Sequence, residues 1–143
     1  MQVSHLGICV RDVEASLRFY RDALGFSVAS ELTVAGEPGD TLLRLRDVSL
    51  RAVYLRKDGL TIELLHYASP GHVGDGAPRA MNALGLTHLS LRVDDLAAAV
   101  ASLAAAGATV LHDTRIDNET LGARAVFVTD PDGTLVELVE SAG

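Results

Sequence analysis

The sequence predicts an α+β fold made of two tandem βαβββ modules, and three observations lead to this prediction. The phrase at residues 5–13 returns at residues 88–96 as His-Leu-x-apolar-x-Val-x-Asp-apolar. The phrase at residues 58–64 returns at residues 132–138 as Asp-Gly-x-x-apolar-Glu-Leu. Between these phrases, each half carries the same succession of strand and helix patterns. Two echoes in the same order indicate an internal repeat.

The first half reads as strand, helix and three strands. Apolar side chains alternate with others over residues 5–10, so His5 is expected to face away from Leu6 on a strand. Asp12 is expected to cap a helix whose apolar residues recur at helical spacing as far as Gly25. Turn-forming residues then separate the strand candidates. These candidates are residues 27–33, 41–45 with 50–56, and 60–66.

The second half repeats this order after a linker. Residues 69–85 are rich in Gly, Pro and small side chains and carry one expected helical turn at 79–84. A helix capped by Asp94 or Asp95 should end at Gly107. One strand is expected before this helix, at residues 87–93, and three after it, at residues 109–113, 123–129 and 135–140. The expected divisions are module 1 at about 1–68, the linker at about 69–85 and module 2 at about 86–140.

The composition describes an acidic chain that can bury a core. Of its 143 residues, 48% are hydrophobic, and the formal net charge is −7. Such a charge repels phosphate backbones, so we expect no nucleic-acid partner. No apolar run reaches the ~18 residues of a membrane helix, and no basic leader precedes the first repeat phrase. A single cysteine fits a reducing compartment. We therefore expect a cytoplasmic protein that does not bind membranes.

The repeat singles out four residues with metal-binding side chains, one His and one Glu in each half. The two glutamates lie inside apolar strands, where an unpaired carboxylate is costly. A divalent cation held by two imidazoles and two carboxylates would compensate, and Ni²⁺, Co²⁺, Zn²⁺, Mn²⁺ or Fe²⁺ suits such a set. Taken singly, each histidine is also compatible with a core residue, and each glutamate with a solvent-facing one. The candidate metal ligands are His5, Glu63, His88 and Glu137.

Over essentially its whole length the chain resembles the vicinal oxygen chelate superfamily, which includes glyoxalase I, methylmalonyl-CoA epimerase, extradiol dioxygenases and bleomycin-resistance proteins. The resemblance rests on the two His phrases, on residues 19–26 and on residues 130–138. It implies a curved mixed sheet around a metal cleft and a homodimer. It also places the family's ligand positions on the four candidate residues.

The resemblance further implies a metal-dependent lyase or isomerase acting on a small molecule. In glyoxalase I and the epimerase, the metal stabilises an enediolate or enolate while a glutamate takes a proton next to a carbonyl. By this analogy, Glu137 is the expected base and Glu63 its symmetric partner. Glyoxalase I typically has Arg and Asn where this chain has Cys9 and Tyr67. That departure disfavours a glutathione adduct and leaves the substrate unassigned.

Two other functions of the same fold stay open from the sequence. One is an antibiotic-binding resistance protein that performs no chemistry, although such proteins generally lack the ligand set. The other is an Fe²⁺-dependent extradiol dioxygenase, which uses two His and one Glu and would tolerate the loss of Glu63. The complete set of four ligands favours the glyoxalase-like or epimerase-like enzyme over both.

Overall fold

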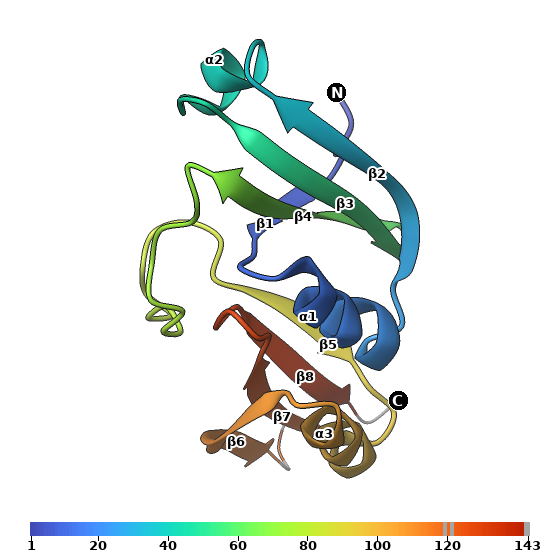
Figure 1. The fold of residues 1–143 in the computed structure, drawn as a ribbon. Helices are drawn as coiled ribbons and strands as arrows, with labels where there is room; N and C mark the ends of the chain where they lie inside the picture. The colour runs from blue at the N-terminus through green and yellow to red at the C-terminus, as the bar shows by residue number, and fades with distance from the viewer. Residues whose placement is uncertain (119, 121, 142–143) are drawn as a thin grey trace. The chain divides into compact units, whose positions relative to one another are not determined.

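The structure of the protein is a computed structural model, and it describes residues 1–118, 120 and 122–141. The chain divides into two compact units, Met1–Gly74 and Asp75–Gly143. Each unit contains one four-stranded sheet, and the elements follow the βαβββ order except for one added short helix (Figure 1). The predicted α+β class and the repeated order of elements are therefore confirmed.

The first unit is built on a mixed sheet in the order β1-β4-β3-β2. Strand β1 (Leu6–Cys9) runs parallel to β4 (Leu60–Ser69). Strand β3 (Ser49–Lys57) lies antiparallel to both β4 and β2 (Ser27–Ala35). The two central strands, β4 and β3, contain the buried residues of the sheet, and together with β1 they place the candidate residues of this unit on one face.

A two-residue turn fixes the register of β3 and β4. Asp58 and Gly59 have φ values of 49° and 81°. Two successive positive φ angles match the twist of the flanking strands. The glycine at the second position adopts a positive φ without strain. Counting outward from this turn, the strands pair Tyr54 with Glu63.

A helical segment covers the face of this sheet that lies opposite the candidate residues (Figure 1). It begins at α1 (Val13–Leu17) and passes directly into a π-helical turn, η1 (Arg18–Ala23), which the sequence pattern does not predict. Gly25, with φ of 78°, ends the segment as expected. The largest side chains of this unit with less than 2% exposure are Tyr20, Leu55, Ile62, Leu64, Val10 and Val53.

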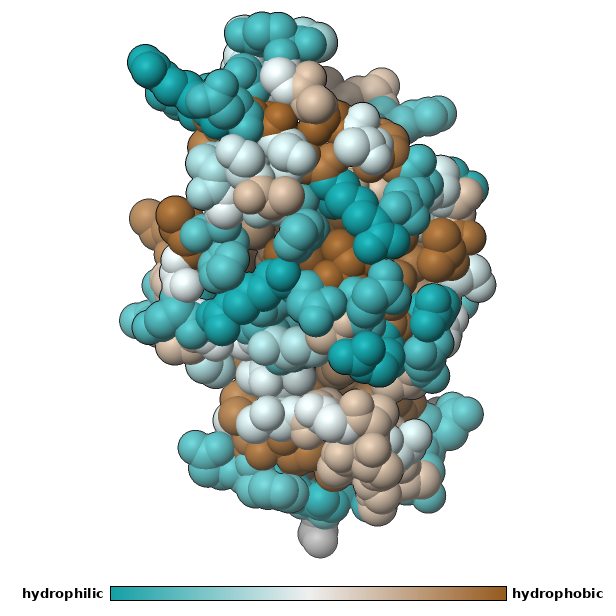
Figure 2. Space-filling model, in the orientation of Figure 1, coloured by the Kyte–Doolittle hydropathy of each residue, from teal (hydrophilic) through white to brown (hydrophobic). Residues whose placement is uncertain are grey.

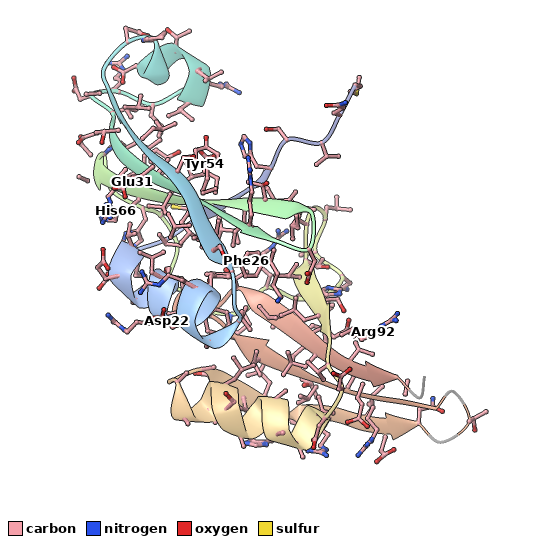
Figure 3. The ribbon with its side chains drawn as sticks, turned by 90° about the vertical axis from the view of Figure 1, so that its right-hand side faces the viewer. Asp22, Phe26, Glu31, Tyr54, His66 and Arg92 are labelled. Atoms are coloured by element: carbon pink, nitrogen blue, oxygen red, sulfur yellow. The ribbon has the colours of Figure 1, made fainter. Side chains whose placement is uncertain are left out.

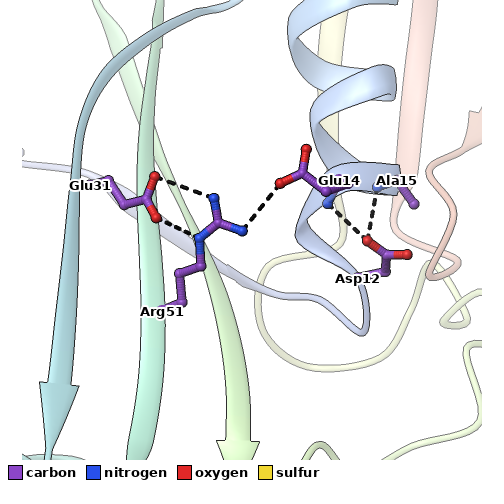
Figure 4. A network of polar contacts seen from close by, with 5 residues as sticks. All are labelled: Asp12, Glu14, Ala15, Glu31 and Arg51. Atoms are coloured by element: carbon purple, nitrogen blue, oxygen red, sulfur yellow. Dashed lines mark hydrogen bonds and ion pairs between the residues drawn. The ribbon is translucent and has the colours of Figure 1, made fainter.

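Polar contacts tie this helix to the sheet (Figure 4). Asp12 caps α1, and the N–H groups of Ala15 and Glu14 hold the pKa of its carboxyl below the ordinary value. Arg51 of β3 contacts Glu31 of β2 at 2.5 Å and Glu14 of α1 at 3.2 Å. The hydrogen bond from Arg51 lowers the pKa of Glu31. One guanidinium therefore joins two strands and the first helical turn.

The strand predicted at residues 41–45 is wrong, because a short helix, α2 (Gly39–Leu43), occupies this region. The Glu37 carboxylate accepts hydrogen bonds from the N–H and hydroxyl of Thr41 at 3.2 and 3.0 Å. Asp40 accepts two more from backbone N–H groups of the following loop. These local side-chain bonds satisfy the backbone without a partner strand.

Helix α2 adds a small core to the sheet face opposite α1. Leucines at the end of α2 and just after it pack over β3, and side chains from β2 and β4 complete the cluster. Its buried members are Val48, Leu50 and Ala52, and the partly buried ones are Val34, Leu43, Leu45, Tyr54, Leu65 and Tyr67.

The second unit repeats the sheet in the order β5-β8-β7-β6. Strand β5 (His88–Arg92) runs parallel to β8 (Leu135–Ser141). Strand β7 (Ala123–Thr129) lies antiparallel to both β8 and β6 (Thr109–Asn118). Strand β6 extends further than the predicted 109–113, and its pairing with β7 contains an irregularity.

Helix α3 (Leu96–Ala105) covers one face of this sheet. Asp95, one of the two predicted caps, accepts a hydrogen bond from the helix backbone at 2.9 Å. Leu96 and Leu103 are buried against the strands, and Gly107, with φ of 90°, follows the helix end as expected. The outer side of α3 consists largely of exposed alanines, which form the pale brown surface in Figure 2.

Residues 75–85 of the predicted linker belong to the second unit. Their backbone approaches the turn before β8 so closely that a Cβ at Gly133, where φ is 86°, would collide with the carbonyl oxygen of Gly76. The helical turn predicted at 79–84 is instead a hydrogen-bonded turn from Ala80 to Ala83. None of the helices in the described part of the chain has the length and hydrophobicity needed to cross a membrane.

Candidate metal centre

In the first unit, His5 and Glu63 lie next to each other on the sheet face opposite α1. His5 precedes β1, whose Gly7 pairs with Glu63 of β4. The imidazole Nε2 lies 3.0 Å from the Glu63 carboxylate, and the two side chains are 35% and 13% exposed. The strand alternation seen in the sequence therefore puts a half-buried carboxylate beside a more accessible imidazole.

Two further residues hold this pair. The Ser4 hydroxyl lies 2.9 Å from Nδ1 of His5. Tyr54 donates a hydrogen bond to Glu63, which is the main reason why its pKa is raised to about 12. The Tyr54 ring also stands edge-on to the imidazole of His5, with ring centres 5.4 Å apart and planes at 88°. Figure 3 shows Tyr54 on one side of the first sheet, and Asp22 of the helical segment and Phe26 just after it on the other.

The second unit contains the corresponding pair, His88 and Glu137. Their closest atoms, Nε2 and Oε2, are 3.7 Å apart, and the side chains are 28% and 27% exposed. The Thr87 hydroxyl lies 2.9 Å from Nδ1 of His88. Ser90 donates a hydrogen bond of 2.7 Å to Glu137. Phe127 stands edge-on to His88, with ring centres 5.4 Å apart and planes at 89°.

Both pairs are suited chemically to a divalent cation. In the tautomer that carries its proton on Nδ1, each imidazole donates to the neighbouring hydroxyl and turns the lone pair of Nε2 toward the glutamate. An imidazole nitrogen beside a carboxylate oxygen is a common donor combination for transition metals. Within either unit, the described residues contain no group of three or more His, Cys, Asp or Glu side chains that could hold a metal. Each pair is thus half of the expected set.

Tyr54 and Ser90 are not among the predicted site residues, although both carry a signal in the sequence. Tyr54 follows from the two-residue turn, because the count from the turn places it opposite Glu63. Ser90 lies two residues after His88 and therefore on the same strand face. Where a histidine and a glutamate lie on one sheet face, a polar residue paired with the glutamate on the neighbouring strand is expected to contact it.

The two positions at which the chain departs from glyoxalase I also lie on this face of the first unit. Cys9 is exposed and follows His5 and Gly7 in the alternation of β1. Tyr67 follows Glu63 in the alternation of β4. Burial raises the pKa of Tyr67, and the nearby Cys9 and Glu63 add to the shift. A thiol and a phenol thus border the pair where an arginine and an amide are typical.

Comparisons with known proteins agree with the fold. The model of the Glyoxalase/Bleomycin resistance protein/Dioxygenase superfamily matches residues 2–138. The uncharacterized protein YaeR of Escherichia coli is 36% identical over 139 residues, covering 97% of this chain and 95% of that protein. An ethylmalonyl-CoA/methylmalonyl-CoA epimerase of Cereibacter sphaeroides is 31% identical over 139 residues, covering 96% of each chain.

Solved structures have the same fold at lower identity. A glyoxalase family protein from Bacillus cereus has a TM-score of 0.85 at 20% identity, covering 100% of this chain and 95% of that one. A variant of a fosfomycin resistance protein from Listeria monocytogenes, in complex with Mn(II) and a dihydroxypropylphosphonic acid, has a TM-score of 0.65 at 14% identity. The match covers 99% of this chain and 90% of that one.

Proposed function

We propose that this chain, which belongs to the Glyoxalase/Bleomycin resistance protein/Dioxygenase superfamily, is a metal-dependent lyase or isomerase that moves a proton next to a carbonyl group. One observation carries the proposal. Each unit builds the same arrangement from equivalent residues, in which a hydroxyl contacts Nδ1 of a histidine and Nε2 faces a glutamate. The same arrangement at equivalent positions of both units is what a metal site that takes one His–Glu pair from each unit requires.

In this proposal the two pairs together hold one divalent metal ion, within one chain or between two. The ligands are His5, Glu63, His88 and Glu137. The manganese in the complex of the Listeria protein supports a divalent metal of this kind. When bound, such an ion would act as a Lewis acid for a substrate oxygen that gains negative charge.

Glu137 is the residue we assign as the base. Its carboxylate is more exposed than that of Glu63, at 27% against 13%, and lies farther from its histidine. A carboxylate that takes up a proton must reach the substrate carbon, so the more accessible glutamate is the better candidate. Ser90 donates a hydrogen bond to one of its oxygens, Oε2, and the other is left to face the substrate.

The substrate class we propose is an acyl thioester with a second carboxyl group, like the substrates named for the Cereibacter epimerase. The α proton of such a thioester is activated by the neighbouring carbonyl, and its removal and return invert the carbon without any redox cofactor. Because Cys9 and Tyr67 stand where glyoxalase I typically has Arg and Asn, a glutathione adduct is the less suitable substrate.

The test uses untagged protein in D₂O with ethylmalonyl-CoA or methylmalonyl-CoA. Mass spectrometry follows the deuterium that enters the carbon between the two carbonyl groups. We expect exchange in the metal-loaded protein, loss after chelation and return when the metal is restored. The His5→Ala/His88→Ala double variant is the control for adventitious metal. Metal-loaded protein that exchanges no proton from either thioester, or stripped protein that exchanges as fast, would contradict the proposal.

Two further measurements on the same protein separate the alternatives. Tight binding of an antibiotic by stripped protein, without product, would favour a resistance protein, and oxygen consumption with Fe²⁺ would favour a dioxygenase. The homodimer, the cytoplasmic location and the lack of a nucleic-acid partner stay predictions of the sequence.

A further inference from the structure

We propose that Tyr54 is a positioning residue that fixes Glu63 as the stationary glutamate of the site, so that Glu137 is the glutamate free to move a proton. This inference rests on the proposed function and deepens it. The repeat makes the two glutamates equivalent in sequence, and the fold makes them different through the side chains that face them.

The position of Tyr54 is set by the hairpin. The turn at Asp58 and Gly59 places Tyr54 directly opposite Glu63 on the neighbouring strand. From there the phenol donates to the carboxylate and the ring packs edge-on against His5. A single side chain therefore contacts both members of the first pair, and movement of either one disturbs the contact with Tyr54.

The counterpart of Tyr54 in the second unit is Phe127. Phe127 lies opposite Glu137 and packs edge-on against His88 with nearly the same geometry, but it has no hydroxyl. The donor to Glu137 is Ser90 instead, from the neighbouring parallel strand. The residue equivalent to Ser90 in the first unit is Gly7, which has no side chain to offer.

The exchange of donors has a chemical consequence. A phenol is much more acidic than an alkyl hydroxyl, so it gives the stronger hydrogen bond to a carboxylate. Its rigid ring also fixes the donor in space, whereas a serine hydroxyl rotates freely. Glu63 thus has a strong, immobile donor and a histidine nitrogen at 3.0 Å, whereas Glu137 has a mobile donor and a histidine nitrogen at 3.7 Å.

The experiment uses two reciprocal variants of the full chain, Tyr54→Phe and Phe127→Tyr. The first removes one oxygen atom from the first pair, and the second adds the same atom opposite Glu137. Stripped protein is titrated with Co²⁺ alone, because its visible absorption reports the ligands as well as the affinity. Turnover is measured separately by deuterium exchange into methylmalonyl-CoA.

We expect Tyr54→Phe to bind Co²⁺ about 10- to 100-fold more weakly, with an altered spectrum, as is typical when a residue that orients a metal ligand is lost. Phe127→Tyr should keep the affinity of the wild type and lose turnover, because the new phenol restrains the base. The double exchange should not regain Co²⁺ affinity, because the hydroxyl then lies opposite the wrong glutamate.

The outcomes separate this inference from the proposed function. Wild-type protein that binds Co²⁺ and exchanges protons, while Tyr54→Phe matches it in affinity and spectrum, would overturn the role of Tyr54 alone. Wild-type protein that binds no Co²⁺ would overturn both. Thermal unfolding of each variant is the control for folding. If Tyr54→Phe does not fold, a Phe127→Tyr protein that keeps full turnover still overturns the inference.

Discussion

In the first unit a phenol on the antiparallel neighbour holds the glutamate, and in the second a serine on the parallel neighbour does so. The histidines, the hydroxyls on their Nδ1 atoms and the edge-on aromatic rings are the same in both. The fold thus preserves the geometry of a His–Glu pair while the source of one hydrogen bond changes. A duplicated sheet can in this way keep its ligands and still give its two glutamates different surroundings.

The two units also anchor their helices differently. In the first unit, Arg51 joins β2 and β3 to the side chain of Glu14 on α1. In the second, Arg124 of β7 contacts Glu140 of β8, whose other oxygen accepts the N–H of Leu96 at 2.6 Å. The contact in the second unit therefore reaches the helix backbone, whereas the contact in the first ends on an exposed side chain.

The largest expected difference between the units concerns the two glutamates. Glu137→Gln should lower deuterium exchange into methylmalonyl-CoA by about 10²- to 10⁴-fold, the usual contribution of a general base. Glu63→Gln should mainly weaken metal binding, and excess metal should restore part of its activity. Exchange is measured across a metal titration for both variants. Full activity of Glu137→Gln at saturating metal would reject its role as base.

The cores should respond alike, because Leu64 of β4 and Leu138 of β8 lie at equivalent places under their helices. Both are buried, at 0% and 1% exposure. Replacing either by alanine should lower the free energy of unfolding by about 2–5 kcal/mol through the lost contacts and the cavity left behind. Urea denaturation checks the two variants side by side. If only one of them loses stability, the units do not contribute to the core in the same way.

A smaller difference is expected for the arginines that anchor the helices. Arg124→Met should lower the midpoint of thermal unfolding more than Arg51→Met does, because Glu140 is only 15% exposed and loses its only ion-pair partner among the described residues, keeping only the N–H of Leu96. The contacts of Arg51 are largely exposed, so added salt should screen them and shrink the effect of its removal. Equal shifts for both variants would remove the distinction between the two anchors.

The smallest effect should appear at acid pH in the first unit. The carboxyls of Asp12 and Glu31 have pKa values below their ordinary 3.8 and 4.5, through the N–H of Ala15 and the guanidinium of Arg51 respectively. A lowered pKa in the folded state stabilises the fold above the ordinary value, and this stabilisation is lost as the pH falls through the folded value. An Asp12→Asn/Glu31→Gln double variant should therefore lose less stability than the wild type between pH 5 and pH 3, as thermal unfolding can measure.

Most of the fold can be predicted from the sequence, because strand alternation and helix caps are local signals. Asp12, Asp95, Gly25 and Gly107 act as expected at the helix ends. The segment at 41–45 could not be assigned by its apolar pattern. Its conformation depends on the carboxylates of Glu37 and Asp40, which bind backbone and side-chain donors nearby. The π-helical turn has no periodicity of its own and is likewise hidden.

For the candidate site, the repeat predicts the four candidate ligands but not the residues that donate hydrogen bonds to them. The repeat indicates the two histidines and two glutamates, because a duplicated chain repeats its functional residues in order. It does not indicate Tyr54, because the residue at the equivalent place is a phenylalanine, and a search for repeated polar residues passes over it. The donors to the glutamates follow from the sequence only if the strand register is first counted from the turn and the strand alternation.

The central claim, that two pairs from two units hold one metal ion, is tested most directly by metal stoichiometry. Untagged wild-type, His5→Ala and His88→Ala proteins are dialysed against the same low concentration of Co²⁺ and analysed for bound metal. The account predicts one ion per chain in the wild type and almost none in either variant, because each loses a ligand of a shared site. A full equivalent retained by either variant, or two ions per wild-type chain, would contradict it.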